Sequence, residues 1–250
     1  MLSLIIPDWP APARVRAAST TRQGGVSTGA YASLNLNYGG GDLPAAVTEN
    51  RRRVYQALEL TAPIWLQQVH GATVVDAASL SESVAADGCY SRQPQRGCVV
   101  QTADCLPVLF CDQAATVVAA AHAGWRGLVR GILPATVQAM ACPPQHILAW
   151  LGPAISVEAF EVGSEVRAAF LALDPAHSDC FRPGKGDRWW ADLYALARQQ
   201  LRSLGITAIY GGDRCTFSEP EWFFSYRRDG QHSGRLASFI TLQPDDSTCI

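Results

Sequence analysis

The sequence lacks several features that specialised classes of protein require. It has 20 lysines and arginines and 22 acidic residues, which gives a net charge of −2. Because there is no excess of positive charge, nucleic acid is not predicted as a partner. No apolar run approaches the roughly 20 residues of a membrane span. The N-terminus has no basic stretch and is interrupted by prolines, unlike a signal peptide. We therefore expect a cytoplasmic protein that binds neither nucleic acid nor membrane and shows no sign of an obligate protein partner.

Metal-binding and disulfide patterns are also sparse. There are five histidines and no His-x-His pair, so the several copper ions of a multicopper oxidase would lack ligands. No Cys-x-x-Cys pair occurs, which disfavours a four-thiolate zinc site. In a reducing cytosol most of the thiols should be small buried side chains, Cys111 among them. The eight cysteines are Cys89, Cys98, Cys105, Cys111, Cys142, Cys180, Cys215 and Cys249.

The composition and the hydrophobic pattern are typical of a folded protein that contains both helices and strands. With 250 residues, 48% of them hydrophobic, the chain can bury a large core. Strands and helices mix without strict alternation, which favours an α+β fold with mixed β-sheets, and no repeat or composition break divides the predicted single domain, 1–250. Periodicity predicts helices over 44–60, 128–140, 164–173 and 190–204, and strands over 62–69, 73–76, 98–103, 106–110, 116–121, 146–151, 206–210 and 235–242.

Some local features carry narrower predictions. Pro134 should kink its helix or mark a restart, and Ser164 should cap the helix that follows it. Residues 174–188 are predicted to form a polar loop. The basic run 51–53 is expected to lie on the solvent-facing side of its helix.

Three potential metal ligands each end an apolar run and are followed within two residues by a glycine or proline. They are His70, Cys105 and His122. Strand ends of this kind can meet at one edge of a sheet, and Gln68 or Asp104 is available as a hydrogen-bond acceptor for a ligating imidazole. Three such ligands leave one position of a tetrahedral zinc open, as in catalytic sites. Taken singly, a cysteine in an apolar run can be core packing, and a histidine can be a hydrogen-bonded structural residue.

Arginines and aromatic residues suggest where a substrate binds. Arg126 follows His122 in the same turn and is expected beside the metal. Tyr226, Arg227 and Arg228 form a second group, because guanidinium groups suit phosphate or carboxylate and rings suit a flat base. Arg22 stands among hydroxyl residues in a Gly- and Ser-rich segment, which is either an anion cradle or a solvated turn.

Motifs along nearly the whole chain resemble one known family. TTRQGGVS, WLQQVHG, TADCLPVLF, AAAHAGWRGL, LGPAI, FEVG, GGDRCT and FFSYRRDG followed by GRLAS are similar, in family order, to the bacterial YfiH proteins, also described as laccase-domain or multicopper polyphenol oxidoreductase proteins. The resemblance implies a single domain with α/β/β/α layers. It also implies zinc held by the histidine of QVHG, the cysteine of ADC and the histidine of AHAGWRG, which are His70, Cys105 and His122 here.

The family has been associated with several activities. The resemblance implies a zinc-dependent purine nucleoside phosphorylase that acts on adenosine, inosine and methylthioadenosine, takes phosphate as its second substrate and also deaminates adenosine. A metal with an open position, arginines and aromatic rings meet the needs of that chemistry, although the H-x-E…P-C-x-x-C signature of cytidine deaminases is missing. Copper can take the place of zinc on affinity alone.

Other functions stay open at the level of the sequence. A peptidoglycan-precursor editing amidase would use the same metal-activated water, and a copper-linked polyphenol oxidase or a non-catalytic metal-binding protein would use the same ligands. In a cysteine hydrolase, Cys105 would be the nucleophile and His122 or His70 the base. Asp104 is expected either to orient a ligand or to act as a base. The residues alone leave undecided which arginine binds phosphate.

Overall fold

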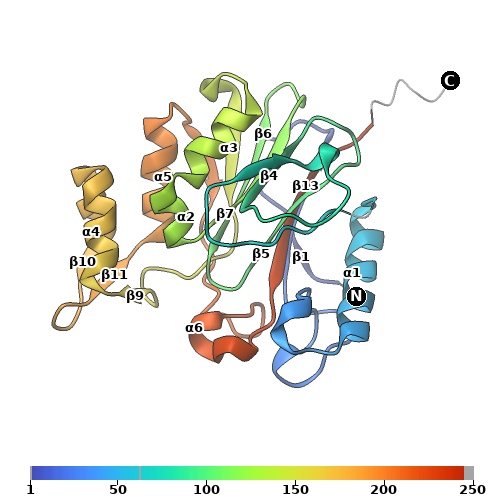
Figure 1. The fold of residues 1–250 in the computed structure, drawn as a ribbon, viewed down its shortest axis with the longest axis horizontal. Coiled ribbons are helices and arrows are strands. Elements are labelled where there is room, and N and C mark those ends of the chain that lie inside the picture. Colours follow the sequence, from blue (N-terminus) through green and yellow to red (C-terminus); the bar gives the residue numbers. More distant parts are fainter. Residues whose placement is uncertain (1, 62, 245–250) are drawn as a thin grey trace.

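Two β-sheets stacked face to face form the centre of the fold (Figure 1). The computed structural model describes residues 2–61 and 63–244. The six-stranded sheet has the order β12 (Ala208–Gly211), β8 (Ile147–Leu151), β6 (Leu106–Asp112), β7 (Val118–Ala123), β4 (Gly88–Ser91) and β3 (Val74–Asp76). The four-stranded sheet has the order β1 (Leu4–Ile5), β2 (Val15–Thr20), β13 (Leu236–Leu242) and β5 (Cys98–Thr102). Parallel pairs, β12 with β8 and β3 with β4, occur beside antiparallel ones, so the sheets are mixed as predicted.

Helices cover the two outer faces of this sandwich. On the six-stranded sheet lie α2 (Trp125–Arg130), α3 (Ile132–Met140) and α5 (Leu193–Ser203), whose apolar stripes join a core with β6, β7 and β8. On the four-stranded sheet lies α1 (Pro44–Leu58), which packs through Val54 against Val99 and Phe239. The predicted α/β/β/α arrangement is confirmed.

A small third sheet lies to one side of the sandwich, next to α4 (Ser164–Leu173) (Figure 1). It has the order β10 (Phe181–Pro183), β11 (Trp189–Ala191) and β9 (Glu161–Val162). The prediction that 174–188 is only a loop was therefore wrong, because β10 falls within it. The short helix α6 (Tyr226–Asp229) precedes β13 and lies below the sheets in the same view.

Helix boundaries differ from the predicted ones for local reasons. Helix α4 begins at Ser164 itself, after Gly163, and no side chain caps it, so Ser164 is not the predicted cap. Helix α5 begins only at Leu193, because the carboxylate of Asp192 accepts a hydrogen bond from the N–H of Ala195. The restart predicted near Pro134 occurs at Gly131, whose φ of +87° ends α2, and Pro134 then lies in the first turn of α3, where no helical N–H bond is lost.

The predicted strand over 62–69 is wrong in the part that the structure describes, 63–69. Only Gln67 pairs there, in an isolated bridge with Ala85. The apolar run that suggested a strand instead supplies Trp65, whose ring meets Phe239 edge-on at 5.6 Å. Trp65 and Leu66 are buried by side-chain packing rather than by sheet pairing, and Val69 is exposed.

The state of the cysteines and the length of the helices complete the description of the fold. Cys111 is fully buried in the layer between the two main sheets, as expected. All seven cysteines in the described part of the chain are free thiols, and Cys249 lies outside it. Within the described residues no helix is both long and apolar enough to cross a lipid bilayer.

Candidate metal centre

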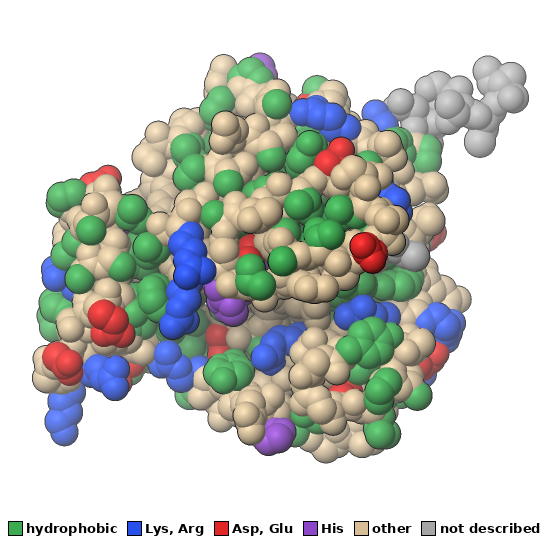
Figure 2. Space-filling view, in the orientation of Figure 1, with side chains coloured by type: hydrophobic (Ala, Val, Ile, Leu, Met, Phe, Trp, Pro, Cys, Tyr) green, Lys and Arg blue, Asp and Glu red, His purple; other side chains and the backbone are tan. Residues whose placement is uncertain are grey.

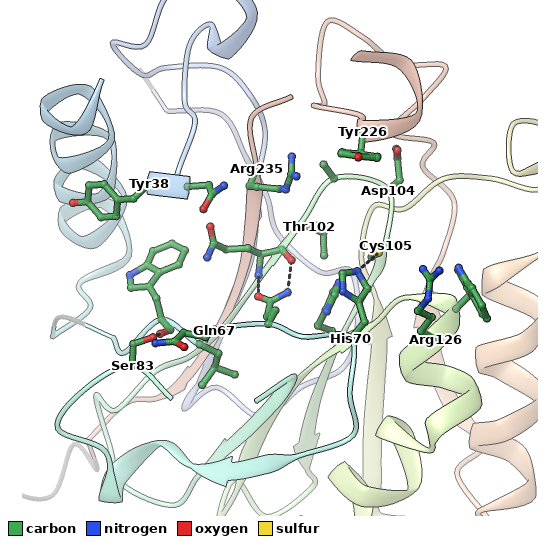
Figure 3. Close-up of a pocket in the computed structure, with 18 of the residues that line it drawn as sticks. Tyr38, Gln67, His70, Ser83, Thr102, Asp104, Cys105, Arg126, Tyr226 and Arg235 are labelled. Atoms are coloured by element: carbon green, nitrogen blue, oxygen red, sulfur yellow. Dashed lines mark hydrogen bonds between the residues drawn. The ribbon is translucent and has the colours of Figure 1, made fainter. Parts of the chain in front are cut away.

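His70, Cys105 and His122 come together at one end of the six-stranded sheet (Figure 3). Pairing of Leu106 with Ala123 brings the start of β6, and with it Cys105, beside His122 on β7. Their potential ligand atoms all lie within 4.8 Å of one another, and the Cys105 Sγ is 3.9 Å from the His70 Nε2. Within the described residues this is the single group of three or more His, Cys, Asp or Glu side chains with such spacing.

A buried carboxylate, Asp87, connects two of these residues. One of its oxygens lies 2.8 Å from the Nδ1 of His122 and 2.9 Å from the backbone nitrogen of His70, and the other accepts from the N–H of Gly71 at 2.6 Å. These bonds hold the turn at His70, where φ is +58°. Because Nδ1 of His122 donates to Asp87, Nε2 is the nitrogen left to bind a metal. No sequence pattern indicates this role of Asp87, since its partners are far from it along the chain.

Asp104 and Gln68 have other roles than the one predicted for them as imidazole acceptors. The two oxygens of Asp104 accept from the Thr216 hydroxyl and from the backbone N–H of Arg227, both at 2.6 Å. Gln68 forms two hydrogen bonds with the backbone of Gln101, at 2.7 and 2.8 Å. Asp104 thus ties α6 to the loop that carries the thiol, and the position beside the imidazole belongs to Asp87.

The electrostatics of the cluster favour a thiolate. Burial acts to raise the pKa of Cys105, but the charge of His122 and hydrogen bonds from His122 and His70 outweigh it and lower the pKa to about 6. For His122, burial acts to lower the pKa, whereas the charge of Cys105 and the bond to Asp87 raise it to about 9. Burial acts to raise the pKa of Asp87 too, and its hydrogen bonds from His122 and Gly71 lower it on balance.

The donor set fits zinc. A thiolate and two imidazoles are ligands that zinc prefers, and tetrahedral ligands 2.0–2.3 Å from zinc stand roughly 3.5 Å apart. The 3.9 Å between the Cys105 and His70 atoms is close to that value. Since a thiolate is the form that binds metal, the lowered pKa of Cys105 supports the same assignment.

The cluster opens into a cavity of about 1140 Å³ (Figures 2 and 3). Its lining includes the aromatic rings of Trp125 and Phe160. The cavity extends from the cluster past Thr102 and Gln67 to Ser83 and Tyr38 (Figure 3). The three predicted ligands therefore lie in one continuous space that is lined by both aromatic and polar side chains.

The predicted substrate-binding residues divide into two groups. Arg126, Tyr226 and Arg227 line the cavity. Arg22 and Arg228 are not among its lining residues, and their guanidinium groups donate to main-chain carbonyls. Those two arginines bind the protein's own backbone, and the segment containing Arg22 is an ordered loop rather than a solvated turn.

Two further arginines, which were not predicted to be near the site, also line the cavity. Arg235 lies beside Tyr226, with its guanidinium 5.6 Å from the ring centre. Burial lowers the pKa of Arg235, and the neighbouring Cys105 and Asp104 oppose that shift. Arg51 was expected to face solvent with the rest of 51–53, but its guanidinium lies 3.7 Å from the ring centre of Trp65. The helical spacing could have indicated that Arg51 is not on the solvent-facing side. It is four residues after Val47, on the buried side of α1.

Known proteins resemble this chain over almost its whole length. A family model described as multi-copper polyphenol oxidoreductase laccase matches residues 16–243. Purine nucleoside phosphorylase YfiH of Escherichia coli is 54% identical over 244 residues, which cover 97% of this chain and 100% of that protein. A purine nucleoside phosphorylase of Pseudomonas aeruginosa is 52% identical with the same coverage.

Solved structures agree with the sequence relatives. A Neisseria meningitidis protein superposes with a TM-score of 0.94 at 50% identity, covering 96% of this chain and 99% of its own. YlmD from Geobacillus stearothermophilus superposes with a TM-score of 0.86 at 32% identity, covering 94% of each chain. These matches confirm the resemblance found in the motifs, and the chain belongs to the multi-copper polyphenol oxidoreductase laccase family, the family of the YfiH proteins.

Proposed function

We propose that the protein is a zinc-dependent purine nucleoside phosphorylase that cleaves adenosine, inosine and methylthioadenosine with phosphate and also deaminates adenosine. The observation that carries the proposal is the convergence of His70, Cys105 and His122 in a cavity lined by arginines and aromatic rings. The names of the E. coli and P. aeruginosa relatives support it. We place this activity in the cytoplasm, on small-molecule substrates and without an obligate protein partner.

The metal would be held by the thiolate of Cys105 and by Nε2 of both histidines. Bound zinc supplies a Lewis acid with one open position, which can hold an anion or activate water. Copper binds such a ligand set more tightly than zinc on affinity alone, so metal availability decides between them. The described part of the chain offers one such three-residue group, too few ligands for the several coppers of a multicopper oxidase.

The chain's own residues would bind and orient the two substrates. In phosphorolysis a phosphate oxygen forms a bond to the anomeric carbon of the ribose while the bond to the purine nitrogen breaks. The electron pair leaves with the purine, which takes up a proton, and the products are the free base and ribose 1-phosphate. Arginines of the cavity neutralise the phosphate, and Trp125 and Phe160 offer flat apolar surfaces for the base.

The test is turnover of adenosine by the purified protein, with and without inorganic phosphate. We expect adenine and ribose 1-phosphate only when phosphate is present, and inosine from the deaminase activity. A Cys105→Ala variant should lose both the metal and turnover, whereas Cys111→Ala, a buried thiol away from the cluster, should keep both. Adenine release that does not depend on phosphate, or no product, contradicts phosphorolysis.

The size of the cavity favours a second candidate, an amidase that edits peptidoglycan precursors. At about 1140 Å³ the space exceeds the roughly 300–1,000 Å³ of typical small-molecule sites. Comparison of kcat/KM for adenosine and for a nucleotide-linked muropeptide separates the two substrates. Metal analysis separates both from a cysteine hydrolase, because a thiolate bound to stoichiometric zinc is not free to act as nucleophile.

A further inference from the structure

Arg235 combines a guanidinium that is fixed by the protein with donors that remain free for a ligand. Its Nη1 donates to the carbonyls of Ser233 and Gly234, at 2.7 and 3.0 Å. Within residues 2–61 and 63–244, its Nε and Nη2 have no hydrogen-bond partner. Figure 3 shows the side chain in the cavity near Thr102 and Tyr226, on the side toward Cys105. Two donors of one guanidinium are thus available to a ligand.

The position of Arg235 is set by its backbone as well as by its side chain. Its N–H donates to the side-chain oxygen of Asn35 at 2.9 Å, and its carbonyl accepts from the N–H of Leu36 at 3.2 Å. Strand β13 begins at the next residue, Leu236. Because the backbone is held here and Nη1 is held by two carbonyls, the guanidinium is oriented before any ligand binds, which lowers the entropy cost of binding.

The other cations of the cavity are less suited to an anion next to the metal centre. Arg126 is exposed and lies 4.3 Å from the ring of its neighbour Trp125. Arg227 donates through Nη1 to the carbonyl of Glu161, away from the cluster. Arg51 lies beside Tyr38 and Trp65, at the far end of the cavity. Arg235, by contrast, is close enough to Cys105 and Asp104 to interact with their charges.

We propose that Arg235 binds the phosphate that attacks the nucleoside. Its two free donors match two oxygens of the anion in the forked geometry that guanidinium groups favour. An anion bound there lies on the side of the cavity toward Cys105 (Figure 3), so that Arg235 positions the nucleophile and neutralises its charge. This inference rests on the proposed phosphorolysis, and it assigns the phosphate to one arginine among several.

Steady-state kinetics of two variants test the assignment. In Arg235→Gln we expect the KM for phosphate to rise about tenfold or more, as for the loss of hydrogen bonds to a charged group, with the KM for adenosine nearly unchanged. Arg235→Lys should fall between this variant and the wild type, because lysine keeps the charge without the fork. Thermal unfolding and zinc content are measured for both, and Arg235→Lys alone decides the matter if Arg235→Gln does not fold. A folded Arg235→Lys with the wild-type KM for phosphate overturns the assignment.

A rival arginine and a binding measurement complete the experiment. Arg126→Gln is studied in parallel, and a larger increase in its KM for phosphate than in that of the Arg235 variants also overturns the assignment. Calorimetric titration with inorganic phosphate measures binding without turnover, and we expect weaker binding to the Arg235 variants. If the wild type binds phosphate through Arg235 but releases no adenine, the proposed phosphorolysis fails while the anion site stands. If the variants bind phosphate as the wild type does, the anion site fails whatever the activity.

Discussion

At the scale of single residues, Asp87 organises the candidate metal centre more than any of the residues that the sequence suggested. Its carboxylate is fully buried and accepts from His122 and from the backbone of the turn at His70. A carboxylate bound in this way orients the imidazole and makes it a stronger ligand. The convergence of His70, Cys105 and His122 could be predicted because each ends an apolar run. The part played by Asp87 could not, because it depends on contacts between distant segments.

Replacement of Asp87 by asparagine should weaken metal binding. The amide keeps one acceptor oxygen and places an NH₂ group against N–H donors of the turn, so His70 and His122 lose part of their orientation. We expect about 10–100-fold lower zinc affinity, measured by competition with a chromophoric chelator. Asp112→Asn is a matched control. The buried carboxylate of Asp112 also accepts hydrogen bonds from backbone N–H groups, those of Thr116 and Val117, but lies away from the cluster. Equal zinc affinity in Asp87→Asn and the wild type would show that Asp87 only supports the fold.

The thiol of Cys105 should react at unusually low pH in the metal-free protein. Its pKa of about 6 means that the thiolate, the reactive form, persists until the pH falls through about 6. The lowered pKa also stabilises the folded protein: this contribution is fully present above about pH 8.5, the pKa of an ordinary thiol, and is lost as the pH falls through about 6. Alkylation by iodoacetamide, followed at Cys105 by mass spectrometry, should be half-maximal near pH 6, and zinc should block it. A midpoint near pH 8.5, that of an ordinary thiol, is the contrary result.

At the scale of secondary-structure elements, the polar connections between them decide the shape of the site. Helix α6 is only four residues long and is held at its start by Asp104, whose carboxylate also binds Thr216. Tyr226 belongs to this helix, and its ring centre lies 5.6 Å from the guanidinium of Arg235. Periodicity cannot predict an element this short, and no apolar pattern indicates that Asp104 anchors it.

An Asp104→Asn variant should loosen α6 without removing the metal ligands. Asparagine tolerates the φ of +89° at this position, so the backbone should be preserved. It has one acceptor oxygen where the carboxylate has two, so one of the bonds to Thr216 and Arg227 is lost, at a cost of about 1–3 kcal/mol. Hydrogen exchange of the amides in 226–232 should be at least about tenfold faster, while the zinc content stays at the wild-type value. Unchanged exchange together with a loss of turnover would instead support the predicted role of Asp104 as a base.

At the scale of the whole molecule, two stacked sheets place the metal cluster where several chain segments meet. The α/β/β/α arrangement could be predicted from the family motifs, and most strands from their apolar runs. The predicted strand is absent from 63–69 because an apolar run indicates burial and not strand pairing. Trp65 is buried by packing of its ring. Strand β13, near one end of the chain, pairs with β2, near the other. This long-range pairing supports our proposal that residues 1–250 form one domain.

Removal of the metal should lower the stability of the entire fold, because the ligands come from three separate segments. His70 follows the bridge at Gln67, Cys105 precedes β6 and His122 lies in β7, so a bound ion links parts of the chain that otherwise meet only through packing. At a free zinc concentration of about 100 Kd, binding to the folded state adds about 2.7 kcal/mol. For a protein of this size, roughly 2–4 °C accompanies each kcal/mol, so we expect the Tm to fall by about 5–10 °C when a chelator removes zinc. The Cys105→Ala variant should show little or no difference in Tm with and without chelator. A wild-type Tm that is also unchanged by the chelator would contradict metal binding at this cluster.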